Sequence, residues 1–374
     1  MSQQQTVLIT GGSGFVGTNL VRLLVHGGEY RVVNLDVLTY AANPLSLADL
    51  EGNPNYVFVK GNITDRELVS SVLAKYEPAG ILHLAAESHV DRSILNAEDF
   101  IQTNVLGTYS MLEAARAYWT ALPTQQKSLF RFLHVSTDEV FGSLGKEGYF
   151  SEETPYAPNS PYAASKAASD HFVRAFHQTY GLPTLTTNCS NNYGPYQFPE
   201  KMIPLIILNA LSGKALPIYG DGSNVRDWIY VQDHCKAVKL VFENGKPGEV
   251  YAIGGNNEQT NIELVNQICA ILDDIAPPVE VPQLREHGLK SYSELIRFVE
   301  DRPGHDHRYA IDSRKITREL GWGAEVPFEA GLHRTIEWYL SNPKWVEQAS
   351  GGSYGEWIEK NYAWRAQQGE KESK

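Results

Sequence analysis

The chain has 374 residues, of which 42% are hydrophobic and 20% are charged, and its formal net charge is −12. This composition is typical of a soluble globular chain of roughly two domains, and the negative charge argues against nonspecific binding to nucleic acid. No apolar segment approaches the ~18 residues that cross a bilayer, and the start MSQQQTVLIT lacks a basic leader, so we expect a cytoplasmic protein without membrane contact.

The first half of the chain alternates short apolar runs with longer amphipathic segments. Strands are predicted at 6–10, 31–36, 56–61, 80–86, 130–136 and 184–189, and helices near 15–26, 65–76, 97–118 and 161–180. Strands that are apolar on both faces and separated by helices are typical of a parallel sheet covered on each side. We therefore predict an α/β fold with a doubly wound Rossmann sheet, whose ligands lie at the carboxyl ends of the strands.

The composition changes after residue 190, where Tyr, Pro and Gly become frequent and predict loops around short elements. A further strand is predicted at 249–255, which could return to the main sheet, and a helix at 261–272. We expect 1–190 plus about 230–255 to form the dinucleotide-binding domain, and about 191–229 and 256–345 to form a smaller, loop-rich α+β substrate-binding domain. Residues 346–374 are predicted to be a C-terminal helix and a polar tail.

The segment TGGSGFVG (10–17) follows the first predicted strand and opens a helix. Gly11, Gly14 and Gly17 allow a tight turn, a close approach of a pyrophosphate and close packing of helix on strand. Asp36 closes the second predicted strand, where a carboxylate can bind both ribose hydroxyls and would repel a 2′-phosphate. This spacing predicts bound NAD rather than NADP.

A tyrosine and a lysine lie one helical turn apart in NSPYAASKA (159–167), with Ser160 as the expected N-cap and Pro161 in the first helical position. Tyr162 and Lys166 share a helix face. An ammonium group near a phenol, together with a positive nicotinamide, lowers the phenol's pKa and favours a base near neutral pH. The same spacing is usually coincidental when it occurs alone, but here it follows a dinucleotide motif.

The strand predicted at 130–136 runs into Thr137, Asp138 and Glu139. Two neighbouring carboxyls cannot both ionise cheaply, so one tends to keep its proton, as an elimination of water by an acid and a base requires. Successive strand residues point to opposite faces, so both acids can serve one substrate only if the strand ends or bends there. The residues alone do not decide which carboxyl is the acid, and a solvated turn after a strand is the alternative.

At these residues the sequence resembles the extended short-chain dehydrogenase/reductase family, and over about 6–345 it is similar to the dTDP-glucose 4,6-dehydratases of that family. The segments that carry this resemblance are LDVLTYAAN, LAAESHVDRSI, STDEVFG, NSPYAASKA, NCSNNYGPYQFPEKMIPL, LPIYGDG, VRDWIYVQDH and DRPGHDHRYAID. The resemblance implies a lyase of deoxysugar (rhamnose-type) biosynthesis that converts dTDP-glucose to dTDP-4-keto-6-deoxyglucose and water and regenerates NAD in each turnover. It implies Thr137, Tyr162 and Lys166 for hydride transfer at C4, Asp138 as acid toward C6 and Glu139 as base at C5.

The same resemblance implies the binding residues. For the cofactor these are Gly11, Gly14, Phe15, Val16, Gly17, Asp36, Val37, Leu38, Thr39, Asn62, Ile63, Leu84, Ala85, Ala86, Ser88, Thr103, Tyr162, Lys166 and Asn192. For the substrate they are Ser88, Thr137, Asn191, Glu200, Lys201, Pro217, Tyr219, Arg226, Asn261 and Arg302. The guanidinium groups of Arg226 and Arg302 match phosphate oxygens, although each such residue taken alone is more often structural. The family also implies a homodimer formed by the helices near 97–118 and 161–180.

Some positions depart from the family pattern or permit another interpretation. Asn62 stands where an Asp is usual beside the adenine, and three further departures, Ala42, Phe141 and Gln232, lie away from the acid, base and hydride groups. His305 and His307 have a metal-like spacing, but no thiol or acid set completes a zinc site, and the three cysteines lack a C-x-x-C spacing and predict free thiols. His89 is expected to be a hydrogen-bonding scaffold near the cofactor. The alternatives are a UDP-hexose 4-epimerase, a UDP-glucuronate decarboxylase or a silent NAD-binding sensor.

Overall fold

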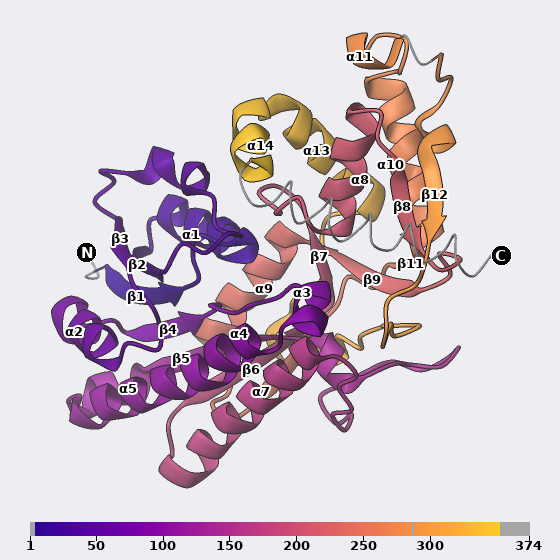
Figure 1. Cartoon of the computed structure of the whole chain (residues 1–374). Helices are drawn as coiled ribbons and strands as arrows, with labels where there is room; N and C mark the ends of the chain where they lie inside the picture. Colours follow the sequence, from indigo (N-terminus) through magenta and orange to yellow (C-terminus); the bar gives the residue numbers. More distant parts are fainter. Residues whose placement is uncertain (1–3, 286–287, 352–374) are drawn as a thin grey trace.

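The structure is a computed structural model that describes residues 4–285 and 288–351. Its main feature is a seven-stranded sheet in the order β10-β6-β5-β4-β1-β2-β3, in which all strands are parallel (Figure 1). The strands are β1 (Gln5–Thr10), β2 (Tyr30–Asp36), β3 (Tyr56–Lys60), β4 (Gly80–His83), β5 (Arg131–Thr137), β6 (Thr184–Cys189) and β10 (Val250–Ile253). All six strands predicted in the first half are confirmed, and the strand predicted at 249–255 joins the sheet beside β6.

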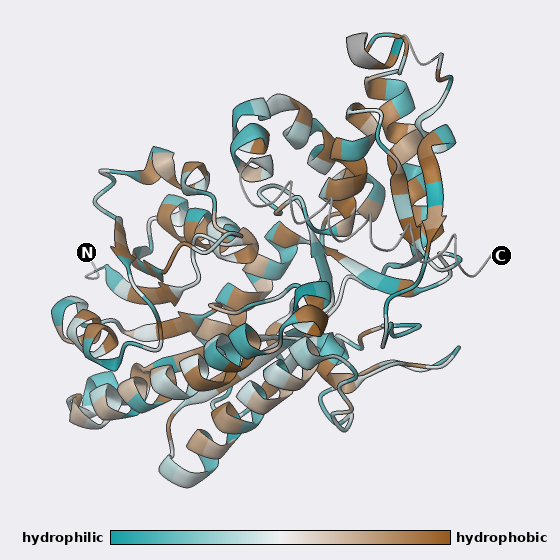
Figure 2. Ribbon diagram, viewed as in Figure 1, coloured by the Kyte–Doolittle hydropathy of each residue, from teal (hydrophilic) through white to brown (hydrophobic). Residues whose placement is uncertain are grey.

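Helices cover both faces of this sheet (Figure 1). One hydrophobic cluster joins the sheet to α1 (Phe15–Gly27), α9 (Val231–Asn244) and α12 (Arg314–Leu320), and a second joins it to α2 (Arg66–Tyr76), α5 (Thr108–Ala121) and α7 (Pro161–Tyr180). Hydrophobic residues concentrate on the strands and on helix faces toward them, whereas the loops are mainly hydrophilic (Figure 2). The predicted doubly wound α/β architecture is therefore confirmed.

The chain reverses its direction of travel across the sheet after β3. Strands β1, β2 and β3 progress toward one edge, and β4 then pairs with the other side of β1. In such sheets the crevice outside the carboxyl ends of the strands at this point is the usual ligand site. The order β4-β1-β2 therefore places the loops that follow these three strands around one crevice.

The single helix predicted at 97–118 is wrong in detail. The structure has a short α4 (Glu98–Phe100), a π-helical stretch over Ile101–Gly107 and then α5. The wider π turn is associated with inward-facing Asn104, whose side chain accepts from the Glu87 N–H at 2.8 Å and donates to the Ser165 hydroxyl at 2.8 Å. The predicted strand at 80–86 also ends earlier, at His83.

The chain after residue 190 holds more regular structure than the sequence indicated. Its elements are β7 (Asn191–Tyr193), β8 (Leu216–Tyr219), β9 (Val225–Tyr230), β11 (Glu258–Thr260), β12 (Ile296–Val299), α8 (Met202–Leu211), α10 (Asn261–Ile275), α11 (Pro282–Arg285), α13 (Phe328–Ser341) and α14 (Pro343–Ser350). Most of these helices surround a hydrophobic cluster that includes Ile206, Leu264 and Leu332. Strands β11, β9 and β7 form one small sheet, and β12 and β8 form another. The last part of the predicted C-terminal tail, 352–374, lies outside the described residues.

Two further short α-helices are α3 (Val90–Leu95) after β4 and α6 (Thr124–Leu129) before β5. Within the ranges that the structure describes, no helix has the length and apolar character needed to cross a membrane.

Candidate active site

The turn between β1 and α1 is closed by glycines that no larger residue could replace. A Cβ on Gly11, whose φ is +71°, would lie 2.7 Å from the Ala85 backbone, and a Cβ on Gly17 would lie 2.1 Å from the Gly11 carbonyl oxygen. Helix α1 begins at Phe15 without a side-chain cap. Its amino terminus therefore presents unpaired N–H groups, which favour a bound phosphate.

Asp36 ends β2 beside this turn, as predicted, and is 8% exposed. Its carboxylate accepts hydrogen bonds from the Ser13 N–H at 2.9 Å and the Leu38 N–H at 2.8 Å. Burial raises the pKa of Asp36, and these hydrogen bonds oppose the rise. The carboxylate is thus held in one orientation at the edge of the crevice.

A cavity of about 790 Å³ extends from the glycine turn across the carboxyl ends of the strands. Every residue predicted to bind the cofactor lines it except Leu38, whose N–H supports Asp36 instead. The five predicted catalytic residues, Thr137, Asp138, Glu139, Tyr162 and Lys166, line its inner part. The structure therefore brings the predicted cofactor-binding and catalytic residues, which come from eight separate segments of the chain, into one cavity.

A second cavity of about 190 Å³ adjoins the first. It is lined by seven of the predicted substrate residues, Asn191, Lys201, Pro217, Tyr219, Arg226, Asn261 and Arg302. The two cavities share Glu139, Asn191, Asn192, Gln197 and Lys201, and the other predicted substrate residues, Ser88, Thr137 and Glu200, line the larger one. A long ligand could therefore lie in the smaller cavity and reach the acids in the larger one.

Strand β5 ends at Thr137, and a 3₁₀ turn over Asp138–Phe141 follows at once. The Thr137 hydroxyl caps this turn by accepting a hydrogen bond from the Glu139 N–H at 3.2 Å. Because the strand ends here, the alternation of side chains is broken and both acids face the same cavity. The sequence predicted that both acids could serve one substrate only if the strand ended or bent at this point, and the strand does end here.

The two carboxyls lie in different electrostatic surroundings. Asp138 is 2% exposed, and burial, followed by the charges of Glu139 and Asp227, raises its pKa well above its ordinary value. Burial also raises the pKa of Glu139, but three cations, Arg302, Lys201 and Arg226, act in the opposite direction. Asp138 is therefore the member of the pair that retains a proton more strongly.

Tyr162 and Lys166 begin α7, where the Ser160 hydroxyl accepts from the Ala163 N–H at 3.1 Å and Pro161 occupies the first turn, as predicted. The Lys166 ammonium donates to the Val135 carbonyl at 2.8 Å. Burial raises the pKa of Tyr162 well above its ordinary value, and the Glu139 charge adds to the rise. The pKa of Tyr162 was expected to be lowered by Lys166. It is raised instead, because burial and the charges of nearby acids outweigh the interactions that lower it.

Sequence reasoning missed a carboxylate that supports this helix from inside. Asp170 accepts from the Ser136 hydroxyl and from the Tyr156 hydroxyl, each at 2.8 Å. Burial lowers the pKa of Lys166, and the Asp170 charge opposes that change. Asp170 lies four residues after Lys166 in the same helix, and this spacing was the available signal.

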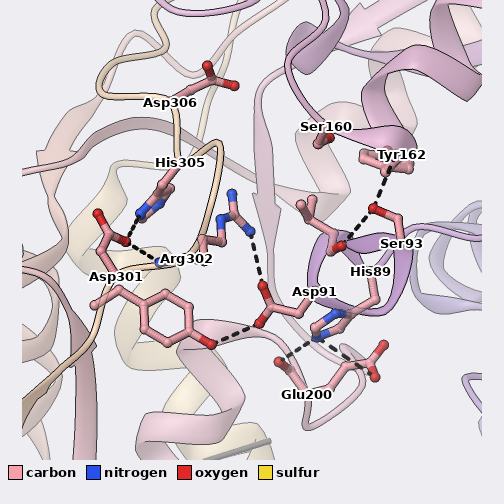
Figure 3. Close-up of polar contacts among 12 residues, drawn as sticks. His89, Asp91, Ser93, Ser160, Tyr162, Glu200, Asp301, Arg302, His305 and Asp306 are labelled. Atoms are coloured by element: carbon pink, nitrogen blue, oxygen red, sulfur yellow. Dashed lines mark hydrogen bonds and ion pairs between the residues drawn. The ribbon is translucent and has the colours of Figure 1, made fainter. Parts of the chain in front are cut away.

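The smaller cavity is organised by a second carboxylate that was also missed. Asp91 of α3 accepts from the Tyr219 hydroxyl at 2.8 Å and pairs with the Arg302 guanidinium at 3.7 Å (Figure 3). Arg226 donates to the Asp306 carbonyl at 2.8 Å, and its guanidinium carbon lies 4.2 Å from the Tyr309 ring centroid. The two arginines that were predicted to bind phosphate are therefore held in place by buried partners.

The histidines of this region lie in hydrogen-bonded positions. The ring of His305 contacts an Asp301 oxygen at 2.6 Å, and burial lowers the pKa of His305 to about 4. His89 lies with its Nε2 3.4 Å from the Glu200 carbonyl oxygen, and its pKa is likewise lowered by burial to about 4 (Figure 3). Within the described ranges, no three His, Cys, Asp or Glu side chains gather closely enough to hold a metal ion. The cysteines Cys189, Cys235 and Cys269 are free thiols.

Comparison with known proteins assigns the family. The sequence model of the GDP-mannose 4,6 dehydratase family matches residues 8–335. A dTDP-glucose 4,6-dehydratase of Xanthomonas campestris is 58% identical over 349 residues, which cover 93% of this chain and 97% of that protein. The dTDP-glucose 4,6-dehydratase 1 of Escherichia coli is 54% identical over 96% of this chain and 99% of that protein.

A solved structure agrees with these sequence matches. The dTDP-glucose 4,6-dehydratase of Bacillus anthracis, crystallised in complex with NAD, superposes with a TM-score of 0.80 at 44% identity and covers 92% of this chain and 99% of its own. The chain therefore belongs to the dTDP-glucose 4,6-dehydratase family of extended short-chain dehydrogenases/reductases.

Proposed function

We propose that this chain is an NAD-dependent hydro-lyase that converts dTDP-glucose to dTDP-4-keto-6-deoxyglucose and water, a step of deoxysugar (rhamnose-type) biosynthesis. The observation that carries the proposal is the pair Asp138 and Glu139, which face one cavity with different proton affinities beside Tyr162 and Lys166. An epimerase or a decarboxylase has no need of this acid–base pair, and a silent sensor has no need of Tyr162 and Lys166.

The larger cavity fits NAD. The glycine turn leaves room for a pyrophosphate where any Cβ would collide, and Asp36 offers a carboxylate that suits free ribose hydroxyls and repels a 2′-phosphate. When bound, NAD supplies a hydride acceptor for C4 of the sugar and later a hydride donor for C6. The relative from Bacillus anthracis was crystallised in complex with NAD, which supports this assignment.

Three residues handle the C4 hydroxyl in this proposal. Tyr162 takes the hydroxyl proton, and Thr137 orients the hydroxyl oxygen. Burial raises the pKa of Tyr162, and a hydrogen bond with Thr137 opposes that rise. Lys166, one helical turn further along α7, has the proposed role of the cation that favours the phenolate. The oxidation makes the C5 hydrogen acidic, because the resulting carbanion can delocalise into the new C4 carbonyl.

The two acids then divide the elimination. Glu139, whose negative form is favoured by three cations, removes the C5 proton. Asp138, whose burial keeps it protonated, gives its proton to the C6 hydroxyl, which leaves as water. The electron pair of the C5–H bond becomes the C5–C6 double bond, so the step is balanced before the hydride returns to C6.

The smaller cavity suits the nucleotide diphosphate. Arg226 and Arg302 offer guanidinium groups for the phosphates, and Pro217 and Tyr219, two residues apart on β8, both line the cavity and suit a flat base. Because this cavity shares Glu139 with the larger one, a sugar attached to the second phosphate would reach the acids.

The predicted division into a dinucleotide-binding domain and a nucleotide-sugar-binding domain is part of this proposal. So are a cytoplasmic setting and a homodimer built on the helices near 97–118 and 161–180. The homodimer is supported by apolar side chains that are exposed on and beside these helices, Leu95, Ile101, Leu106 and Phe172.

The proposal is tested by turnover in heavy water of dTDP-glucose labelled with tritium at C4. We expect a 4-keto-6-deoxy product that carries the tritium at C6 and solvent deuterium at C5, without added reductant. An epimerase would return the label to C4 and leave C5 unexchanged. Tritium retained at C4, a C5 hydrogen that does not exchange, or no product at all would contradict the proposed function.

A further inference from the structure

Two segments that follow β2 and β4, the strands on either side of β1, contact each other. Tyr40 lies four residues past the end of β2, and Arg92 lies in α3, in the chain that follows β4. Strands β2 and β4 flank β1 on opposite sides. The Arg92 guanidinium carbon nevertheless lies 3.7 Å from the centroid of the Tyr40 ring, which places the cation on the face of the aromatic ring.

A third residue, Glu200, is hydrogen-bonded to both Tyr40 and Arg92. The Glu200 carboxylate accepts from the Tyr40 hydroxyl at 3.1 Å through one oxygen and from the Arg92 Nε at 3.0 Å through the other. Glu200 precedes α8, and its side chain is only 2% exposed. Figure 3 shows it below His89, the residue that immediately precedes α3. Tyr40, Arg92 and Glu200, here called the strap, thus join three segments that are far apart in the sequence.

The strap carries a balanced set of charges. Burial and the charges of Glu200 and Glu87 raise the pKa of Tyr40, so the phenol remains a neutral hydrogen-bond donor. The charged members are therefore Arg92 and Glu200, one of each sign and joined by a hydrogen bond. A partly buried pair of this kind is weakened little by salt, and removing one member takes away a charged hydrogen-bond partner of the other.

All three strap residues line the larger cavity together with the glycine turn and Asp36. We propose that the strap crosses the dinucleotide seat over the end of β1 and retains NAD between turnovers. This inference rests on the proposed function, because it needs NAD in that cavity. The proposed reaction returns the hydride within each cycle, so the enzyme gains nothing from exchanging the cofactor.

The test is the rate at which NAD leaves the protein. The holoenzyme is freed of unbound NAD by gel filtration, diluted, and assayed over time for NAD still bound. In Arg92→Met the side chain keeps its length and its contact with Tyr40 but loses the cation and the bond to Glu200. We expect NAD to leave about tenfold faster, and added NAD to restore the lost activity.

Two further variants make the test specific. Tyr40→Phe keeps the ring under Arg92 and removes only the hydroxyl bond to Glu200, so a rise of about threefold in the release rate is expected. The matched control is Arg22→Met, because Arg22 also lies over a tyrosine, Tyr196 at 5.3 Å, and pairs with Asp49 at 2.7 Å, but lines neither cavity. The control should release NAD at the parental rate.

The outcomes separate the two proposals. If Arg92→Met and Tyr40→Phe both hold NAD as long as the parent does, the strap does not retain NAD, while the proposed function stands. If the parent neither carries nor takes up NAD, the proposed function fails and the strap fails with it. Faster release from all three variants, the Arg22 control included, would show a general loss of stability and would overturn the strap.

Discussion

At the scale of single residues, the active site depends on a difference between two adjacent carboxyls. Asp138 and Glu139 share a cavity, and the charges of Arg302, Lys201 and Arg226 oppose the rise in the pKa of Glu139. Asp138 is more deeply buried, and the charges of Glu139 and Asp227 add to the rise in its pKa. This difference supports the proposed roles of Asp138 as the acid and Glu139 as the base, which the residues alone left open.

This difference predicts opposite behaviour of two matched variants. Glu139→Gln should abolish the exchange of the C5 hydrogen with solvent and lower product formation by roughly 10²- to 10⁴-fold, because the base is lost. Asp138→Asn should lower product formation by a similar factor but retain C5 exchange, because only the leaving hydroxyl lacks its acid. Deuterium at C5 of recovered sugar, measured by mass spectrometry, distinguishes them.

Each of these variants serves as the control for the other, since both replace a carboxyl by an amide of the same size at neighbouring positions. If C5 exchange were lost in Asp138→Asn and kept in Glu139→Gln, the roles would be reversed. If both variants formed product at the parental rate, neither carboxyl would take part in the reaction.

At the scale of elements, the seat for the dinucleotide depends on how closely α1 approaches β1. Gly17→Ala would place a Cβ 2.1 Å from the Gly11 carbonyl oxygen, against backbone that cannot rotate away. We expect a purified variant with less than about a tenth of the parental NAD content, because the turn must open to admit the methyl group. The measurement is NAD released by denaturing the purified protein.

Gly323→Ala is the control for this change. A Cβ on Gly323 would meet nothing within 4 Å, and the residue lies in a loop outside both cavities. It should keep the parental NAD content. A full complement of NAD in Gly17→Ala would contradict the role given to the turn.

Elements whose signals are local could be predicted from the sequence. Strand β5 contains the apolar residues Phe132, Leu133 and Val135, and α7 begins with a Ser-Pro cap, so both were predicted with nearly correct bounds. The π-helical turn around Asn104 was not predicted, because it depends on partners in the loop after β4 and in α7. Strands such as β8 and β9 pair only across long sequence separations and contain Pro, Asp and Arg, which hide the usual alternation.

The site shows the same division. Thr137, Tyr162 and Lys166 stand in short contiguous motifs and were predicted by position. Asp91 and Asp170 were not, because their importance lies in what they contact, Tyr219 and Arg302 for the first and Ser136 and Tyr156 for the second. Such contacts become visible only when the chain is folded.

At the scale of the whole molecule, the exposed apolar side chains are not evenly spread. Leu106 is 45% exposed in the π-helical stretch and Phe172 is 40% exposed in α7, on two helices that pack side by side (Figure 1). Clustered exposed apolar residues commonly mark a protein interface. This arrangement supports a homodimer that buries the two helices.

Replacing both residues, as in Leu106→Lys with Phe172→Lys, should convert the dimer to a monomer, because four buried charges per dimer would lack partners. Sedimentation equilibrium measures the change. Val279→Lys is the control, since Val279 is 61% exposed far along the chain, before α11, and should leave the association unchanged. A parent that sediments as a monomer would rule out the homodimer.

The two cavities share one set of lining residues around Glu139, while Arg226 and Arg302 line only the smaller cavity. In the proposed binding mode, a ligand held through its phosphates at those arginines would place its sugar beside Glu139 only if the linkage between them spans the distance from the smaller cavity to the larger one. The length of the phosphate linkage would then decide which sugar nucleotides react.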